Sequence, residues 1–256
     1  MNSIRMVTWL APGIPLALFE HIREHLQDVL GLPVSLESRS KRSGPASGSA
    51  DPFADDIADM GFLCAPAAVP ASIRQQAGFD LLGLAPLYDD SRYRGQPRCY
   101  CDIVVREDTA GSGLQATEGM TLGYNDTSSL SGWLGLSHEL QKQQTRPERF
   151  FGQLIHTGGH LTSIERLLEG SIQVASIDSN VLRTHPGVMQ GLRVIDSVGP
   201  WPSQPVVVRR SLDSTLKAQL RAALGTCGPW PQWGFVGFRP QDSTHLGQVP
   251  TAAQES

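Results

Sequence analysis

The stretch FFGQLIHTGGHLTSIERLLEGSIQVASIDSNVL, residues 150–182, holds the pattern that decides the fold. Its glycine-rich turn leads into apolar residues at helical spacing over 160–170, which predict an amphipathic helix. The apolar residues before Asp178 predict a short buried strand. A turn, a helix and a strand in this order are typical of βαβ units. The sequence therefore predicts an α/β protein with a mostly parallel sheet.

The same alternation of strands and helices continues on both sides of this stretch. Strands are expected at residues 4–10, 32–38, 60–69, 98–108 and 119–126, with two short ones within 192–210. Helices are expected at residues 15–31, 53–59, 129–143 and 212–224. The Ser-, Gly- and Pro-rich residues 39–52 predict a loop, and the polar residues 241–256 predict a loosely ordered tail.

The composition is that of a soluble globular protein, either one large domain or two lobes. The chain has 256 residues, of which 40% are hydrophobic and 18% are charged, and its net charge is −4. This charge gives no basic surface for nucleic acid, and no run of charges suggests a membrane surface. We therefore expect no nucleic-acid partner and no insertion into a membrane.

The cellular compartment stays open at this stage. The apolar N-terminal segment is followed directly by charged residues and lacks a small-residue cleavage site, so it predicts a strand and a helix. The cysteines demand no disulfide, because Cys99 and Cys101 alternate on one strand face while Cys64 and Cys227 are far apart in sequence. The expected location is the periplasm if a signal segment has been removed, and the cytoplasm otherwise.

Two predicted helix starts carry side chains that suit an anion. In GYNDTSSLSGW, residues 123–133, small hydroxyl and amide side chains stand where a helix must begin. In HTGGH, residues 156–160, glycines let the backbone approach a ligand, and the His160 ring can donate to it. The unpaired N–H groups of a helix start bind phosphate, phosphonate or sulfate. The alternative is that the hydroxyls only cap the helix and that His160 forms a local hydrogen bond.

Two further features bear on the nature of the ligand. Asp178 ends a predicted strand, where ligands bind in open α/β sheets, and its carboxylate suits a ligand with a cationic or protonated group. Equally, Asp178 can cap the short helix that follows. His156 and His160 are four residues apart, but the glycine pair between them breaks the helical register that a shared metal ion needs. We therefore expect no metal site.

Four segments resemble, in order, the periplasmic phosphate/phosphonate-binding proteins of ABC transporters. They are DPFADDIADMGFLCAP (51–66), YNDTSSLSG (124–132), HTGGHLTSIERLLEGSIQVASIDSNVL (156–182) and GPWPSQPVVV (199–208), and the resemblance spans roughly Ile4 to Leu224. It implies the type 2 periplasmic-binding fold, in which two α/β lobes are joined by two crossover strands and the ligand is enclosed between them. We expect lobe 1 at residues 1–98 plus 195–256 and lobe 2 at residues 99–194.

The resemblance also implies roles for individual side chains. Ser128, Ser129 and Ser131 match the serines that cradle the anion, His160 matches a histidine that meets it, and Asp178 matches an acid that receives a ligand amine. At the first crossover, relatives often carry Tyr after Pro, whereas this chain has Cys99 followed by Tyr100. The expected ligand-binding residues are Trp9, Cys64, Tyr100, Tyr124, Asn125, Ser128, Ser129, Ser131, Thr157, Gly158, His160, Asp178 and Ser179.

The expected function is reversible capture of a small anionic solute by a monomer, without a cofactor or a catalytic residue. Hinge closure would bury the solute and present the closed form to an ABC permease. Two alternatives stay open. One is an enzyme on the same fold that uses His160, Asp178 or Cys64, although the chain shows no catalytic triad order, zinc spacing or dinucleotide motif. The other is a cytoplasmic ligand sensor.

Overall fold

The computed structural model describes residues 3–39, 44, 50–66, 68, 78–241, 246–247 and 249–250. The chain divides into two compact units. The first comprises the described residues of 1–98 and 202–249, and the second those of 99–201 together with Pro250. The boundary that the sequence predicts between residues 194 and 195 falls inside a strand, β10 (Leu192–Pro202).

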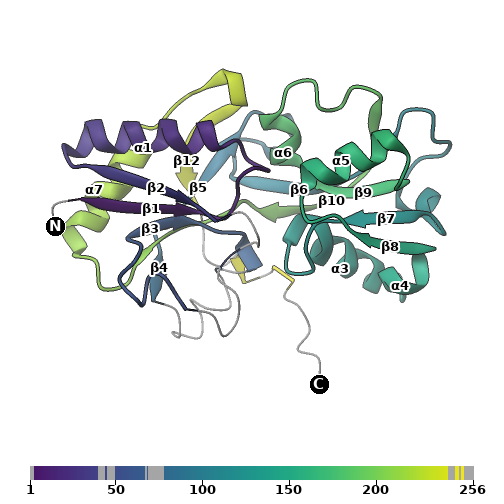
Figure 1. The fold of residues 1–256 in the computed structure, drawn as a ribbon, viewed down its shortest axis with the longest axis horizontal. Helices are drawn as coiled ribbons and strands as arrows, with labels where there is room; N and C mark the ends of the chain where they lie inside the picture. The colour runs from purple at the N-terminus through teal and green to yellow at the C-terminus, as the bar shows by residue number, and fades with distance from the viewer. Residues whose placement is uncertain are drawn as a thin grey trace. The chain divides into compact units, whose positions relative to one another are not determined.

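The first unit is built on a five-stranded sheet in the order β2-β1-β3-β11-β4 (Figure 1). These strands are β2 (Val34–Ser38), β1 (Ile4–Thr8), β3 (Met60–Phe62), β11 (Val206–Arg209) and β4 (Phe79–Leu81). β1 runs parallel to β2 and β3, whereas β11 runs antiparallel to β3 and β4. A separate antiparallel pair is formed by β5 (Leu84–Tyr88) and β12 (Phe235–Pro240).

Two helices of this unit, α1 (Leu16–Leu30) and α7 (Ser214–Gly225), pack against each other. The helical spacing of apolar residues in α1 is the expected one, and it buries Phe19, Ile22 and Leu26. Gly31 ends the helix in the left-handed conformation, with φ 64°, which glycine adopts without strain. Asp213 caps α7 by accepting from two backbone N–H groups.

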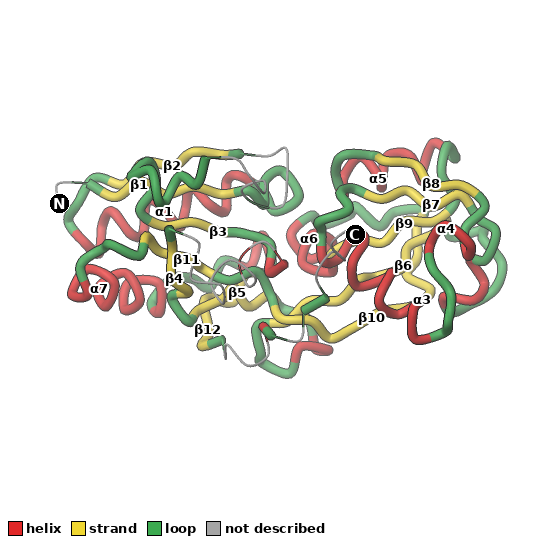
Figure 2. Tube along the Cα trace, turned by 90° about the horizontal axis from the view of Figure 1, so that it is seen from below, coloured by secondary structure: helices red, strands yellow, loops and turns green. Residues whose placement is uncertain are grey.

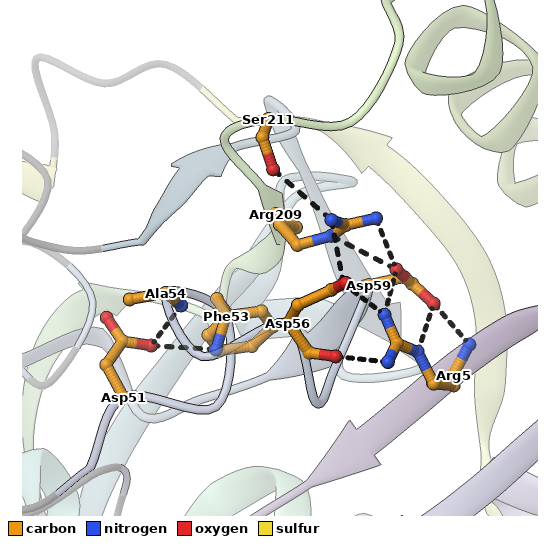
Figure 3. A network of polar contacts seen from close by, with 8 residues as sticks. All are labelled: Arg5, Asp51, Phe53, Ala54, Asp56, Asp59, Arg209 and Ser211. Atoms are coloured by element: carbon orange, nitrogen blue, oxygen red, sulfur yellow. Dashed lines mark hydrogen bonds and ion pairs between the residues drawn. The ribbon is translucent and has the colours of Figure 1, made fainter.

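A buried carboxylate ties three strands of the first sheet together (Figure 3). Asp59, which is fully buried, accepts from Arg5 Nε at 2.9 Å and pairs with Arg209 Nη2 at 2.9 Å. Asp56, on the exposed side, pairs with the same two arginines. Hydrogen bonds with both carboxylates raise the pKa of Arg5 above its ordinary value. The network joins the start of β1, the residue before β3 and the end of β11.

The second unit has a five-stranded sheet in the order β10-β6-β9-β7-β8. Besides β10, its strands are β6 (Arg98–Arg106), β9 (Val174–Asp178), β7 (Thr121–Tyr124) and β8 (Gln153–His156). β7 is parallel to β8 and β9, and β6 is antiparallel to β9. In Figure 1, α5 (His160–Glu169) lies on one face of the sheet, and α3 (Gly135–Lys142) and α4 (Pro147–Phe150) lie on the other.

Short helices complete the two units, and Figure 2 colours the helices, strands and loops separately. They are α6 (Ser179–Thr184), the π-helical turn η3 (Leu130–Leu134), and the 3₁₀ turns η1 (Ser91–Tyr93), η2 (Leu114–Thr117) and η4 (Pro231–Trp233). The turn η3 runs directly into α3, and the carbonyl of Ser129 accepts from the N–H groups of both Trp133 and Leu134. The helix predicted at 129–143 therefore exists, but its first turn is wider than an α-helical turn.

Several sequence-based predictions need correction. The helix predicted at 53–59 is wrong, because the N–H groups of Ile57 and Ala58 both donate to the Pro52 carbonyl and close a wide turn, and Asp59 pairs with Arg5 and Arg209. The strand predicted at 60–69 ends at Phe62. Most of the predicted loop at 39–52 and tail at 241–256 lies outside the described residues. All four cysteine side chains are buried.

Candidate functional site

Four of the predicted ligand-binding side chains meet at one edge of the second sheet. They come from the helix start after β7, from the start of α5 and from the end of β9, namely Ser129, Ser131, His160 and Asp178. Because β7, β8 and β9 are parallel, their carboxyl ends lie at the same edge, where ligands of open α/β sheets bind. All four side chains are buried.

Ser131 stands at the centre of this cluster. Its Oγ lies 3.2 Å from His160 Nε2 and donates to Asp178 Oδ2, also at 3.2 Å. Its backbone carbonyl accepts from Ser176 Oγ at 2.5 Å, which fixes the turn of η3 against β9. One hydroxyl therefore connects the start of α5 with the end of β9.

Asp178 has two roles in the structure. Its Oδ1 accepts from Asn180 N at 2.9 Å and caps α6, so the capping interpretation is confirmed. Its Oδ2 accepts from Ser131, so the same carboxylate also belongs to the cluster. The interpretation in which Asp178 also receives a cationic group of the ligand stays a prediction.

Asn125 and Ser129 form the second part of the cluster. Ser129 Oγ accepts from Gly132 N at 3.2 Å, which confirms that it caps the helix start, and from Asn125 Nδ2 at 3.3 Å. Asn125 Nδ2 also lies 3.4 Å from His160 Nε2. A Cβ atom on Gly132 would come within 1.6 Å of Asn125 Oδ1, so glycine is what allows the Asn125 side chain its present position. The sequence analysis missed Gly132, and its only signal was its place beside the serines.

Burial makes His160 a neutral group at physiological pH. Its side chain is 9% exposed, and desolvation lowers its pKa to about 4, against a smaller opposing effect of the Ser176 carbonyl. The ring is therefore uncharged in the ligand-free protein. The site offers hydroxyl groups, an imidazole and the first N–H groups of a helix, which are the groups that bind small oxyanions.

The predicted residues of the HTGGH turn shape the backbone around His160. Thr157 Oγ1 donates to Tyr124 O at 2.9 Å and lies 2.6 Å from Ser163 Oγ. Gly158 has φ 81°, a conformation that other residues rarely adopt. These contacts join the end of β7 to the start of α5, and so they hold His160 in place.

Three other predicted residues of the second unit lie around the cluster. The Tyr124 ring packs against the Trp133 ring, at 4.7 Å between centroids, and against the His156 ring, at 5.4 Å. Ser179 Oγ accepts from Tyr100 N at 2.8 Å, which links β6 to the start of α6.

Ser128 lies apart from the cluster, because it is exposed and its Oγ donates to Asp126. Trp9 and Cys64 belong to the first unit, and their expected contact with the ligand stays a prediction. Trp9 is 8% exposed and packs with Phe53 in the core, with the Arg39 guanidinium 5.7 Å from its ring centroid.

Two features are absent from the described part of the chain: a cluster of metal-binding side chains and a helix suited to span a membrane. Within those residues, no group of three or more His, Cys, Asp or Glu side chains is arranged to hold a metal ion. Within the same ranges, no helix combines the length and the apolar character needed to span a bilayer.

The chain is similar in structure to several solved binding proteins. The binding protein component of an ABC phosphonate transporter from Pseudomonas aeruginosa has a TM-score of 0.75 and 17% identity, over 96% of this chain and 83% of that chain. PhnD1 from Prochlorococcus marinus in complex with methylphosphonate has a TM-score of 0.74 and 13% identity, over 97% and 96%. XAC2383 from Xanthomonas citri bound to ATP has a TM-score of 0.68 and 18% identity, over 97% and 96%. These likenesses show the type 2 periplasmic-binding fold.

The comparison with protein families is more specific. No curated protein sequence matches the chain. The family model described as "ABC transporter, phosphonate, periplasmic substrate-binding protein" matches residues 10–246. Because this match includes the site and most of both units, the chain belongs to the periplasmic substrate-binding proteins of phosphonate ABC transporters.

Proposed function

We propose that the protein captures a small phosphonate or phosphate at the edge of the second sheet, with Ser129, Ser131 and His160 around the anion. The observation that carries this proposal is the position of Ser131, which contacts both His160 and Asp178 at the start of a helix. A helix start carries unpaired N–H groups and a partial positive charge. An oxyanion placed there gains hydrogen bonds to charged oxygen, which are stronger than those between neutral groups.

The buried carboxylate of Asp178 limits which small anions the proposed site can bind. Its carboxylate is buried beside Ser131, and a second anion next to it is unfavourable unless the ligand also carries a donor. An amine or a hydrogen on the oxyanion supplies such a donor. The proposed ligands are therefore aminophosphonates and oxyanions that keep a hydrogen.

The proposed cycle contains no chemical step. The two units act as the lobes of a monomer in the periplasm, the ligand is bound reversibly, and the closed form delivers it to an ABC permease. Family membership supports the transport role. PhnD1 in complex with methylphosphonate supports the choice of a phosphonate as the first ligand to test.

Binding of methylphosphonate, aminoethylphosphonate and inorganic phosphate by isothermal titration calorimetry tests the proposal. Ser131→Ala removes a hydroxyl of the cluster and should weaken binding roughly ten- to a hundredfold. Ser128→Ala is the matched control, because Ser128 is exposed, bonds to Asp126 and lies only three positions away. The proposal is wrong if none of the three anions binds, or if both variants weaken binding equally.

Mass spectrometry of the ligand recovered after binding separates capture from catalysis. A binding protein returns methylphosphonate or aminoethylphosphonate with its mass unchanged. Conversion to a product on incubation with the protein alone would favour an enzyme on the same fold.

A further inference from the structure

The turn η3, which carries Ser131, is wider than an α-helical turn because of where its N–H groups donate. Leu134 N donates to Ser129 O at 2.9 Å, and Gly135 N donates to Leu130 O. Each of these bonds joins residues five positions apart, whereas the bonds of an α-helix join residues four apart. In an α-helical turn, Gly135 N would donate to Ser131 O instead. The form of the turn therefore depends on which carbonyl Gly135 N reaches.

Two side chains of the sheet bind the carbonyl groups of this turn. Ser176 Oγ, on β9, donates to Ser131 O at 2.5 Å. Cys101 Sγ, on the neighbouring strand β6, donates to Leu130 O at 3.7 Å, which is a weak bond. An α-helical bond runs along the helix axis, so a carbonyl drawn sideways toward β9 is a poorer acceptor for Gly135 N. The bond from Ser176 therefore favours the wide form of the turn.

The spacing of residues on β9 explains how one strand holds Ser131 at two points. Ser176 and Asp178 are two positions apart on the strand, so their side chains lie on the same face of the sheet. Ser176 binds the carbonyl of Ser131, and Asp178 Oδ2 accepts from its hydroxyl at 3.2 Å. Both side chains are buried, which shields these bonds from water. Ser131 is therefore oriented in the ligand-free protein.

Gly135 leaves the space that this arrangement uses. Its φ of −65° is open to any residue, so its lack of a side chain matters for packing alone. A Cβ atom there would lie 2.4 Å from Cys101 Sγ and 3.1 Å from Leu130 O. Cys101 is fully buried, so its sulfur has no open space to move into. Glycine at position 135 thus allows the close approach of β6 to the turn.

We propose that Ser176 is a positioning residue of the anion site. By drawing the Ser131 carbonyl toward β9, it keeps the turn in the wide form. This form holds the Ser131 hydroxyl between His160 and Asp178. The contribution to ligand binding rests on the function proposed above, whereas the form of the turn is a property of the ligand-free protein. The two parts are therefore tested separately.

The first test follows the Gly135 amide by NMR of the ligand-free protein. Scalar couplings across hydrogen bonds connect an amide nitrogen with the carbonyl carbon that accepts its hydrogen. In the wild type, the coupling from Gly135 should reach Leu130. In Ser176→Ala, which removes the hydroxyl, it should reach Ser131, as the turn tightens into an α-helical one. A wild-type coupling to Ser131 would overturn the proposal, and so would a coupling that still reaches only Leu130 in Ser176→Ala.

Thr117→Val is the matched control for the loss of a buried hydroxyl. Thr117 is fully buried in the second unit, and its Oγ1 donates to Leu114 O at 2.7 Å. It lies in η2, before the start of β7, whereas η3 follows the end of β7. The control should lower the midpoint of urea unfolding about as much as Ser176→Ala does and leave the Gly135 coupling as in the wild type. A shifted coupling in the control would contradict a specific role of Ser176.

The second test measures binding of methylphosphonate, aminoethylphosphonate and inorganic phosphate by isothermal titration calorimetry. Ser176→Ala should weaken binding of each anion that the wild type binds, about tenfold or more, because the Ser131 hydroxyl leaves the cluster. Thr117→Val should bind these anions as tightly as the wild type does. Unchanged affinity in Ser176→Ala, or an equal loss in both variants, would overturn the positioning role.

The two tests also separate this proposal from the function itself. If none of the three anions binds the wild type, the proposed function fails, and the Gly135 coupling still decides how Ser176 shapes the turn. Should Ser176→Ala fail to fold, Ser176→Cys takes its place, because a thiol fills the same site but donates only weakly. A Gly135 coupling that does not change in Ser176→Cys would then overturn the proposal.

Discussion

Asp178 accepts a hydrogen bond from Ser131 at 3.2 Å, although the two residues are 47 positions apart in the chain. The bond ties the end of β9 to the helix start that follows β7. Because the same carboxylate caps α6, a change at Asp178 affects both the cluster and a neighbouring helix. Variants at this position must therefore keep the cap if they are to report on the ligand.

Asp178→Asn meets this condition, since Asn caps a helix about as well as Asp does. We expect stability close to that of the wild type and a selective loss of affinity for aminoethylphosphonate, about tenfold or more relative to methylphosphonate. The reason is the lost attraction between a carboxylate and an amine. Titration calorimetry with both ligands measures the ratio. An equal loss for both ligands would show that Asp178 does not receive the amine.

Ser129→Ala should reduce both stability and affinity. The lost cap costs about 0.5 to 2 kcal/mol of unfolding free energy, and the lost hydroxyl weakens anion binding roughly tenfold or more. His160→Ala should weaken binding as well, and the double variant should lose less or more than the sum, because groups on one ligand are coupled. Thermal unfolding and calorimetry on the wild type and these three variants provide the double-mutant cycle. Strictly additive losses would place Ser129 and His160 in separate sites.

Stability should fall on the acid side because His160 is buried in its neutral form. Its pKa is about 4 in the folded protein, against 6.5 as the ordinary value for histidine. The contribution is therefore fully present above pH 6.5 and is lost as the pH falls through 4, up to about 3 kcal/mol. Urea unfolding across this range should show a weaker pH dependence for His160→Gln. The same dependence of unfolding free energy on pH in the wild type and in His160→Gln would contradict a lowered pKa of His160.

Gly132→Ala should displace Asn125, because the new Cβ atom would lie 1.6 Å from Asn125 Oδ1. We expect a loss of about 1 to 3 kcal/mol of unfolding free energy, together with weaker binding of methylphosphonate. In the Asn125→Ala background the same substitution should cost much less, since the clashing group is absent. Chemical denaturation of the four proteins measures this difference. An equal loss of unfolding free energy in both backgrounds would show that Gly132→Ala does not act through Asn125.

Asp59→Asn should strongly destabilise the first unit. It leaves Arg5 and Arg209 facing a neutral group where both had a buried carboxylate, a loss of about 3 kcal/mol. Asp56→Asn is the matched control, because Asp56 pairs with the same arginines but is 67% exposed. Its effect should be much smaller, since water screens exposed pairs. Denaturant unfolding of both variants decides the comparison.

Elements defined by local patterns could be predicted from the sequence. Helix α5 and strand β9 have the expected spacing of apolar residues, and the acid at the end of β9 stands where the parallel strands predict it. The end of α1 at Gly31 and the cap of α7 at Asp213 follow from residue type alone.

Features that depend on distant partners could not be predicted in this way. The pair β5 and β12 was missed because its strands are far apart in the chain and both contain proline. The contact of Asn125 with His160 spans 35 positions and exists only because Gly132 leaves room for the amide. The helix predicted at 53–59 is absent because Asp51 accepts from Gly78 N, 27 positions away, and Asp59 pairs with Arg5 and Arg209, which are 54 and 150 positions away.

The burial of the cysteines makes the protein suitable for site-specific labelling. The thiolate is the reactive form of cysteine, and burial both blocks access to Cys64, Cys99 and Cys101 and raises the pKa of Cys227 to about 12. A cysteine introduced at an exposed position such as Leu168, which is 49% exposed, would then be the preferred target of a maleimide dye. A fluorescent reporter of ligand uptake can therefore be attached while the native cysteines stay in place.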